Sequence, residues 1–216
     1  MSEWHSPKYW RSRPTDERIR NLRIPPRYRN CTFDSFESDT VGPHDLQKAV
    51  RKWCSTFEEQ QSEGMGLYIY GPTGLGKTHI SVSALREVVT KNQCSGLFLN
   101  YDIYTEMVHD ARNSDGLLPE MYGDPNLLKY TRRVLDVVVI DNLNNDRLTD
   151  YMANTTADLI ESRWEMKLPT IITTSIIPDK LSSIFSPRTA SIIKASCYLI
   201  GVKGSDYRLK DLDGEG

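Results

Sequence analysis

The feature that most constrains the fold of this chain is a glycine-rich segment set between two apolar ones. Residues 71–78 read Gly-Pro-Thr-Gly-Leu-Gly-Lys-Thr, which fits the pattern G-x-x-x-x-G-K-[ST]. The apolar run at 67–70 predicts a strand before the segment, and apolar residues at helical spacing over 80–89 predict a helix after it. Strand, loop and helix in this order are the setting of a phosphate-binding P-loop.

The residue types of this loop indicate how a triphosphate would be held. Glycines let the backbone turn so that successive N–H groups converge, and the following helix adds its positive N-terminal end. The Lys77 ammonium would reach the β- and γ-phosphates of ATP, and the Thr78 hydroxyl would be a ligand of Mg²⁺. We therefore predict an ATP site formed by Gly71, Pro72, Thr73, Gly74, Leu75, Gly76, Lys77 and Thr78.

A second apolar segment, residues 134–141, ends in an acidic side chain about sixty residues past the P-loop. It predicts a buried strand of the Walker B type, in which Asp141 would hold Mg²⁺ through water. Apolar runs at 96–100, 170–175 and 197–202 predict further strands, with helices over 44–60, 101–112, 126–133 and from about 150 to 167. We expect an α/β fold, a three-layer P-loop NTPase with a parallel sheet.

Charge and apolar patterning limit the function classes. Residues 1–30 carry eight Lys and Arg against three acidic residues, whereas the whole chain has a net charge of −2. Residues 1–23 also hold Trp4, Tyr9 and Trp10, so this arm is either a solvated tail or a segment that docks on a partner. No apolar run approaches the roughly 18 residues of a membrane helix, and the four cysteines lack C-x-x-C spacing, so we expect a reduced, cytoplasmic protein.

Beyond the P-loop, further segments carry a family resemblance. Residues 24–28 read Ile-Pro-Pro-Arg-Tyr and residues 32–36 read Thr-Phe-Asp-Ser-Phe. Together with the two nucleotide motifs they resemble the DnaC-type replicative helicase loaders and their IstB-type transposition relatives, within the AAA+ ATPases. The resemblance implies an AAA+ ATP-binding domain over 24–210, after the arm at 1–23 and before an acidic tail at 211–216. It also implies that Phe33 and Phe36 wall the adenine side of the pocket. The alternative is that both are plain core aromatics.

The resemblance assigns further site residues, and the chain departs from the family at several of them. The family expects Asp-Glu at the end of the Walker B strand, where this chain has Asp141 and Asn142. An amide cannot accept the proton of the attacking water, so we expect a weak ATPase that binds ATP and hydrolyses it slowly. Thr174 is the implied sensor I residue, Arg188 an arginine finger facing a neighbouring subunit, and Arg208 the sensor II residue.

The resemblance implies a helicase-loader-like protein of DNA replication. It would assemble with itself when ATP is bound and would bind a replicative helicase. Single-stranded DNA would be a further partner, contacted by Arg112, Lys129, Arg132 and Arg133, although so small a cluster is more often solvated surface. Two alternatives stay open: an IstB-like transposition helper ATPase, and a non-hydrolysing module that is gated by ATP and regulates a host loader.

Overall fold

The structure is a computed structural model that describes residues 9, 12–37, 41–114, 127–144 and 149–204. Helices and strands alternate along the chain, as expected for a parallel sheet. In chain order the elements are α2 (Thr15–Arg20), the 3-10 helix η2 (Pro26–Tyr28), α3 (Val41–Ser55), α4 (Phe57–Glu63), β1 (Gly66–Tyr70), α5 (Lys77–Lys91), β2 (Gly96–Asn100), α6 (Tyr101–Asn113), α7 (Leu127–Arg133), β3 (Val137–Leu143), α8 (Asp150–Glu165), β4 (Thr170–Thr174), the 3-10 helix η4 (Pro178–Ser183), α9 (Pro187–Ser196) and β5 (Cys197–Gly201).

The five strands form one sheet in the order β2-β3-β4-β1-β5, and every neighbouring pair is parallel. β1 and β3 lie on either side of β4 in the middle of the sheet. Their carboxyl ends therefore meet at one edge, together with the loop that follows β1. The predicted parallel α/β architecture is confirmed, and its topology brings the two nucleotide motifs together.

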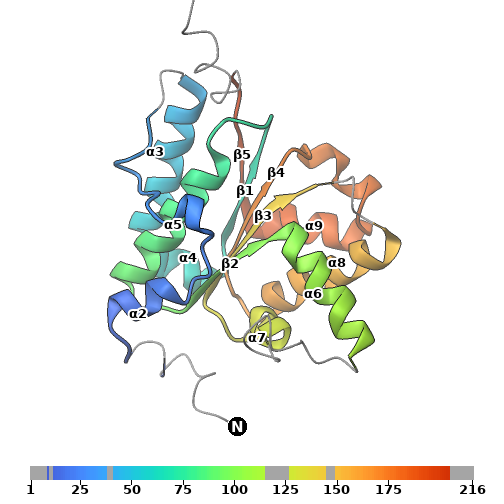
Figure 1. Cartoon of the computed structure of the whole chain (residues 1–216). Coiled ribbons are helices and arrows are strands. Elements are labelled where there is room, and N and C mark those ends of the chain that lie inside the picture. Colours follow the sequence, from blue (N-terminus) through green and yellow to red (C-terminus); the bar gives the residue numbers. More distant parts are fainter. Residues whose placement is uncertain (1–8, 10–11, 38–40, 115–126, 145–148, 205–216) are drawn as a thin grey trace, which may run out of the picture.

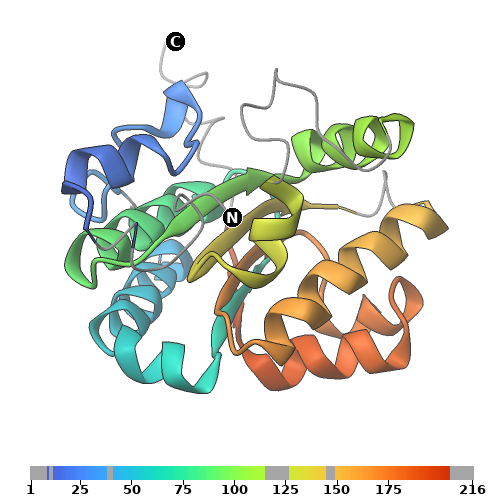
Figure 2. The same ribbon diagram turned by 90° about the horizontal axis from the view of Figure 1, so that it is seen from below.

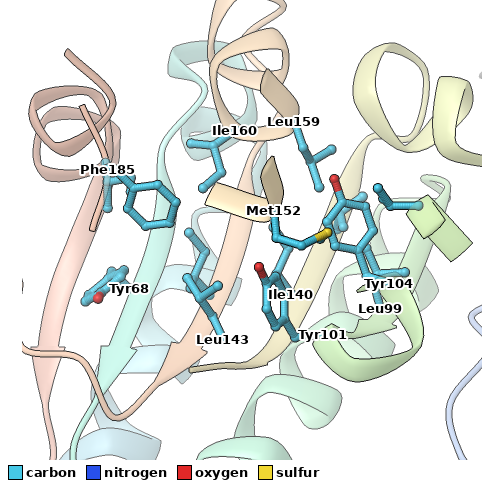
Figure 3. Packing of buried hydrophobic residues seen from close by; sticks show 14 of the residues in the cluster. Tyr68, Leu99, Tyr101, Tyr104, Ile140, Leu143, Met152, Leu159, Ile160 and Phe185 are labelled. Atoms are coloured by element: carbon cyan, nitrogen blue, oxygen red, sulfur yellow. The ribbon is translucent and has the colours of Figure 1, made fainter. Parts of the chain in front are cut away.

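Helices cover both faces of the sheet and make the fold three-layered (Figures 1 and 2). The helices α2 to α5 lie on one face, and α6 to α9 lie on the other. Side chains alternate between the two layers, so that Val137 and Val139 pack toward α5 while Val138 and Ile140 pack toward α6 and α8. Figure 3 shows part of the second layer, where Tyr68, Leu143 and Phe185 pack together with residues of α6 and α8. Burial on both faces explains why the strands read as unbroken apolar runs.

Two elements differ from the boundaries that the sequence predicts. The helix expected over 44–60 is two helices, because the backbone leaves the helical region at Thr56, with φ −116° and ψ 27°. The strand expected to end at Asp141 continues to Leu143, with an irregular register against β4. Asn142 lies in this irregular stretch at φ 63°, a conformation that Asn tolerates better than most residues.

The predicted arm is in part docked on the domain. In α2, buried Arg18 donates a hydrogen bond of 2.7 Å from its guanidinium to the backbone oxygen of Val89 in α5. Leu22 is buried, and its backbone oxygen accepts a hydrogen bond of 2.7 Å from Phe98 N at the outer edge of β2. Residues 15–22 thus pack on the layer that holds the P-loop helix. The remainder of the arm, residues 1–8, 10 and 11, and the tail at 211–216 lie outside the described residues.

A buried arginine joins the elements at the amino ends of the strands. Arg163 of α8 is fully buried and donates to the backbone oxygens of Thr131, Leu135 and Pro169 at 2.6, 3.0 and 2.9 Å. Its Nε donates to the Thr170 hydroxyl at 2.9 Å. Burial lowers the pKa of this guanidinium, and nearby Asp136 opposes the shift. The network fixes α7, α8 and the start of β4 relative to one another.

In the described part of the chain no helix has the length and apolar character needed to cross a bilayer.

Candidate functional site

The P-loop joins β1 to α5 and needs glycine at two close contacts. Gly71 and Gly76 have φ of 147° and 75°. A Cβ at Gly71 would lie 2.4 Å from the backbone oxygen of Val202, and one at Gly76 would lie 2.4 Å from the ring of Phe36. Gly76 is also the N-cap of α5 and provides no side chain to cap it. The first backbone N–H groups of α5 therefore point into the loop, where an anion is the natural partner.

Lys77, the first residue of α5, lies against the loop itself. Its ammonium donates to the backbone oxygens of Gly71 and Pro72, at 2.7 and 2.6 Å. These contacts hold the charge beside the N–H groups of the loop. A phosphate bound in the loop would meet the ammonium and the backbone donors together.

Asp141 is the centre of the polar cluster at the carboxyl ends of the strands. Thr78 donates to its Oδ1 at 2.9 Å and Thr173 donates to the same oxygen at 2.7 Å. The side chain is buried, and burial raises the pKa of Asp141, while the bonds from Thr173 and Thr78 and the charge of Lys77 lower it. One carboxylate is thus linked to the end of β4 and to the first turn of α5.

The donor set of this cluster fits Mg²⁺. A carboxylate and a hydroxyl are hard oxygen ligands, which Mg²⁺ prefers, and the ion retains several waters in nucleotide sites. Asp141 and Thr78 would hold it, and a bound cation would also offset the cost of burying the Asp141 charge. When present, the ion would neutralise the charge of the bound phosphates.

The residues after Asp141 face the same cavity. Asn142 is exposed and lines the cavity, and its backbone N–H donates to the Thr173 hydroxyl at 2.9 Å. Thr174, the predicted sensor, also lines the cavity, but its hydroxyl donates to the backbone oxygen of Leu143 at 2.6 Å. Sequence reasoning missed Thr173, which directly contacts Asp141. The alternation of side chains along β4 could have identified Thr173, because it lies on the same face of the strand as Ile171, which packs toward α5.

One cavity of about 530 Å³ joins these parts. The residues 27–37 contribute one side of it, including Phe36, whereas Phe33 is not among the lining residues. Phe33 is buried, with the Arg51 guanidinium 4.8 Å from its ring centre. The cavity is lined by Arg27, Tyr28, Ser35, Phe36, Glu37, Pro43, Thr73, Gly74, Leu75, Gly76, Lys77, Thr78, His79, Asn100, Asp141, Asn142, Thr173, Thr174 and Ser175.

Arg188, the predicted arginine finger, is not among the residues that line this cavity. Arg188 lies in α9, where its Nε donates to Glu161 of α8 at 2.9 Å and its guanidinium lies 3.8 Å from Glu165. The bond from Thr189, together with the Arg188 contact, lowers the pKa of Glu161. Arg208 lies outside the described residues. A role of Arg188 toward a neighbouring subunit stays a prediction.

No protein-family model matches the chain. Among curated proteins it is 27% identical over 160 residues to the replicative helicase loader DnaI of Bacillus subtilis (strain 168), a match covering 72% of this chain and 47% of DnaI. It is 23% identical over 143 residues to the replicative helicase loader DnaC of Buchnera aphidicola, covering 59% of this chain and 56% of DnaC. The chain thus spans about half the length of the curated relatives it matches.

Solved structures share the fold. A crystal structure of the DnaC helicase loader superposes with a TM-score of 0.69 at 24% identity, covering 83% of this chain and all of that one. The replication initiator DnaA bound to AMPPCP and single-stranded DNA superposes with a TM-score of 0.62 at 17% identity, covering 88% of this chain and 57% of that one. The strand order 2-3-4-1-5 matches the AAA+ P-loop core. The chain is therefore a distant homologue of the DnaC- and DnaI-type replicative helicase loaders of the AAA+ class.

Proposed function

We propose that this chain binds ATP with Mg²⁺ and acts as a helicase-loader-like AAA+ protein of DNA replication. The observation that carries the proposal is the cluster of Thr78, Asp141 and Thr173 beside the P-loop, in one cavity. The distant homology to proteins named replicative helicase loaders supports the biological setting. The structure of DnaA with AMPPCP supports a triphosphate ligand for this fold.

In this proposal each side chain of the cluster has a separate task. The loop N–H groups and Lys77 bind the phosphates, and Thr78 and Asp141 hold Mg²⁺. Asn142 lines the cavity where the family has a glutamate, and its amide can orient a water molecule but cannot take its proton. Because a missing general base costs about 10² to 10⁴ in rate, hydrolysis should be slow.

The ATP-bound form would assemble with itself, and Arg188 would then act on the nucleotide of a neighbouring subunit. Its side chain is 63% exposed, so it is accessible to such a neighbour, but it would have to leave Glu161 and Glu165 to do so. Mixing Arg188→Ala with Lys77→Ala protein tests this arrangement. Recovery of hydrolysis in the mixture would support a finger provided in trans, since each variant supplies the part that the other lacks.

We assign helicase binding to the part of the arm that precedes α2, residues 1–11. Deleting all of residues 1–23 would be a poor test, because it would also remove Arg18 and Leu22, which contact α5 and β2. A chain starting at residue 12 keeps both contacts. Retention of helicase binding by this shorter chain would contradict the assignment, and its melting temperature serves as the control for folding.

Single-stranded DNA is proposed as a second partner at the α6 and α8 surface. The Arg112 guanidinium lies 5.0 Å from the ring centre of Tyr151, which is 45% exposed, so a cation and an aromatic face are presented together. Such pairs bind phosphate and stack bases without sequence preference. Arg112→Ala should weaken DNA binding and reduce its dependence on salt, whereas Arg51→Ala, on α3, should not.

The first experiment measures ATP and ATPγS binding together with steady-state hydrolysis, with and without single-stranded DNA. Tight binding with slow turnover that DNA accelerates would support the loader. Tight binding with no turnover under any condition would favour the ATP-gated regulatory module, for which the cavity-lining Asn142 is the specific observation. Absence of ATP binding would overturn the proposal. Stimulation by a transposase rather than a helicase would favour the IstB-like helper.

A further inference from the structure

One side of the cavity is built from residues that precede the sheet. Residues 27–37 contribute Tyr28, Phe36 and other lining side chains, while Thr32 and Phe33 are not among the lining residues. The segment has little regular structure beyond η2, so its position depends on contacts with neighbouring helices. Those contacts decide what the cavity can bind beside the phosphates.

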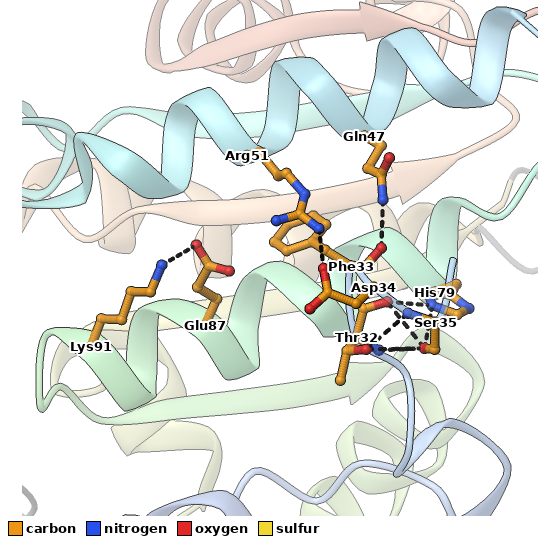
Figure 4. A network of polar contacts seen from close by, with 9 residues as sticks. All are labelled: Thr32, Phe33, Asp34, Ser35, Gln47, Arg51, His79, Glu87 and Lys91. Carbon is orange, nitrogen blue, oxygen red and sulfur yellow. Dashed lines mark hydrogen bonds and ion pairs between the residues drawn. The ribbon is translucent and has the colours of Figure 1, made fainter. Parts of the chain in front are cut away.

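Side chains from two helices hold this segment (Figure 4). From α3, Gln47 donates to the backbone oxygen of Phe33 at 2.5 Å, and Arg51 forms an ion pair of 2.6 Å with Asp34. From α5, His79 lies 2.8 Å from the backbone oxygen of Thr32. Because a carbonyl oxygen can only accept, His79 Nε2 carries the proton of this bond.

His79 also contacts the aromatic residue that lines the cavity. The His79 and Phe36 rings meet edge to face, with centres 5.1 Å apart and an interplanar angle of 64°. On its other side, the Phe36 ring lies so close to Gly76 that no side chain would fit there. Phe36 is thus positioned between the P-loop backbone and His79, half-buried and facing the cavity.

The position of His79 in α5 ties this wall to the phosphate site. Lys77, Thr78 and His79 are consecutive in the first turn of the helix. Their side chains reach the loop carbonyls, Asp141 and Thr32 respectively. One helical turn therefore fixes the distance between the phosphate-binding loop and Phe36, without a further flexible element between them.

We propose that His79 is a positioning residue that holds Phe36 as the surface on which the base of the nucleotide stacks. This inference rests on the proposed function, because it assigns a base-binding wall to the same cavity. Aromatic rings stack any base through its π-face, so Phe36 adds affinity for nucleotides over inorganic phosphates. His79 does not contact the phosphates in this proposal, and it acts through Thr32 and Phe36.

The test compares the affinities for ATP and for inorganic tripolyphosphate, both with Mg²⁺, by titration calorimetry. Loss of one stacked base typically weakens binding about tenfold, so His79→Ala and Phe36→Ala should each weaken ATP binding about tenfold. Tripolyphosphate binding should stay within about twofold, because the loop and Lys77 are intact. His79→Gln should restore most of the ATP affinity, since its amide N–H can donate to the Thr32 oxygen.

Arg86→Ala is the matched control. Arg86 lies in the same helix and donates to the backbone oxygen of Arg29, so the variant loosens the segment without touching Phe36. Its ATP affinity should be unchanged. Equal losses for ATP and tripolyphosphate in His79→Ala, unchanged ATP binding in that variant, or an equal loss in Arg86→Ala would each overturn the inference.

The wild-type chain separates this inference from the proposed function. If it binds tripolyphosphate as tightly as ATP, the base-stacking wall is refuted while the triphosphate site stands. If it binds neither ligand, the proposed function fails and the inference fails with it.

Discussion

Thr173 donates a hydrogen bond of 2.7 Å to Asp141, and the same Thr173 oxygen accepts the backbone N–H of Asn142 at 2.9 Å. One hydroxyl group of β4 therefore orients the carboxylate at the end of β3 and fixes the residue that follows it. Thr174, the next residue, makes its hydrogen bonds to Leu143 and Ile176 instead. Two adjacent threonines of one strand thus have separate tasks.

We predict that Thr173→Val weakens Mg²⁺-dependent ATP binding about tenfold, because a hydrogen bond to a buried charged group is lost. Thr173→Ser keeps the hydroxyl and should bind normally. Thr174→Val is the matched control in the same strand and should change the melting temperature more than the affinity. The measurement is ATP titration with Mg²⁺ and with EDTA, and equal effects of the two valine variants on affinity would contradict the prediction.

Asp141→Asn should raise stability at pH 7 while weakening the proposed binding of Mg²⁺. The pKa of Asp141 is raised above its ordinary 3.8, so the folded chain binds the proton more tightly than the unfolded chain does. The free energy of unfolding therefore falls as pH rises through the window above 3.8, and the penalty persists at neutral pH. Removing the charge should therefore stabilise the chain at pH 7, within the roughly 0.5 to 2 kcal/mol that single stabilising substitutions commonly give.

The gain from Asp141→Asn should vanish once the pH is lowered below 3.8, where the wild-type carboxyl is protonated in both states. Thermal melts from pH 3 to pH 8 check this trend. The control is Asp136→Asn, at the position directly before the start of β3. Asp136 accepts three hydrogen bonds from Ser95 and Gln61, so loss of its carboxylate should destabilise the chain. A lower melting temperature for Asp141→Asn at pH 7 would refute the argument.

Asn142→Glu should raise ATP hydrolysis by about 10² to 10⁴, by supplying the missing general base. Because Asn142 lies at φ 63°, glutamate should also cost about 1 kcal/mol of stability there. Asn142→Gly is the matched control, since it relieves the backbone and adds no carboxylate. Steady-state turnover and melting temperature are measured for both variants, and a rise in turnover with glycine would show that backbone strain, not the amide, limits the rate.

Arg163→Lys should destabilise the fold by about 3 kcal/mol, because an ammonium cannot replace the planar donors that serve several buried oxygens. Arg188→Lys, the same substitution at an exposed pair, should change stability by less than about 1 kcal/mol. Urea denaturation measures both. Nucleotide affinity of folded Arg163→Lys should be unchanged, since the network lies at the amino ends of the strands and the cavity at their carboxyl ends.

The fold was predictable because its determinants are local. The P-loop pattern, the apolar run before Asp141 and the strand at 170–174 each carry their own signal, and parallel pairing brings them to one edge. The break at Thr56 was not predictable in this way, because apolar spacing continues across it and the turn shows only in the backbone. The docking of α2 was missed because Arg18 reads as one more basic residue of a polar arm.

The site was predictable where a motif fixes it and not where tertiary contacts do. Lys77, Thr78 and Asp141 follow from their motifs, and the structure brings all three to one cavity. Their roles toward ATP and Mg²⁺ stay predictions. Identifying Thr173 rather than Thr174 as the residue that contacts Asp141 required knowing which face of β4 meets α5. Identifying Phe36 rather than Phe33 as the residue that lines the cavity required the contact of Phe36 with Gly76, which no sequence spacing reveals.

The P-loop helix has a partner at each end. Its first turn reaches the cavity and its last turns receive Arg18 of α2 at Val89, so the 12 residues from Lys77 to Val89 separate the two contacts by about 18 Å. Thermodynamic linkage makes the two events reciprocal. If nucleotide binding favours the docked state of α2 by some free energy, docking of α2 favours nucleotide binding by the same free energy. Amide hydrogen exchange in residues 15–22 would therefore report on a ligand that never touches them.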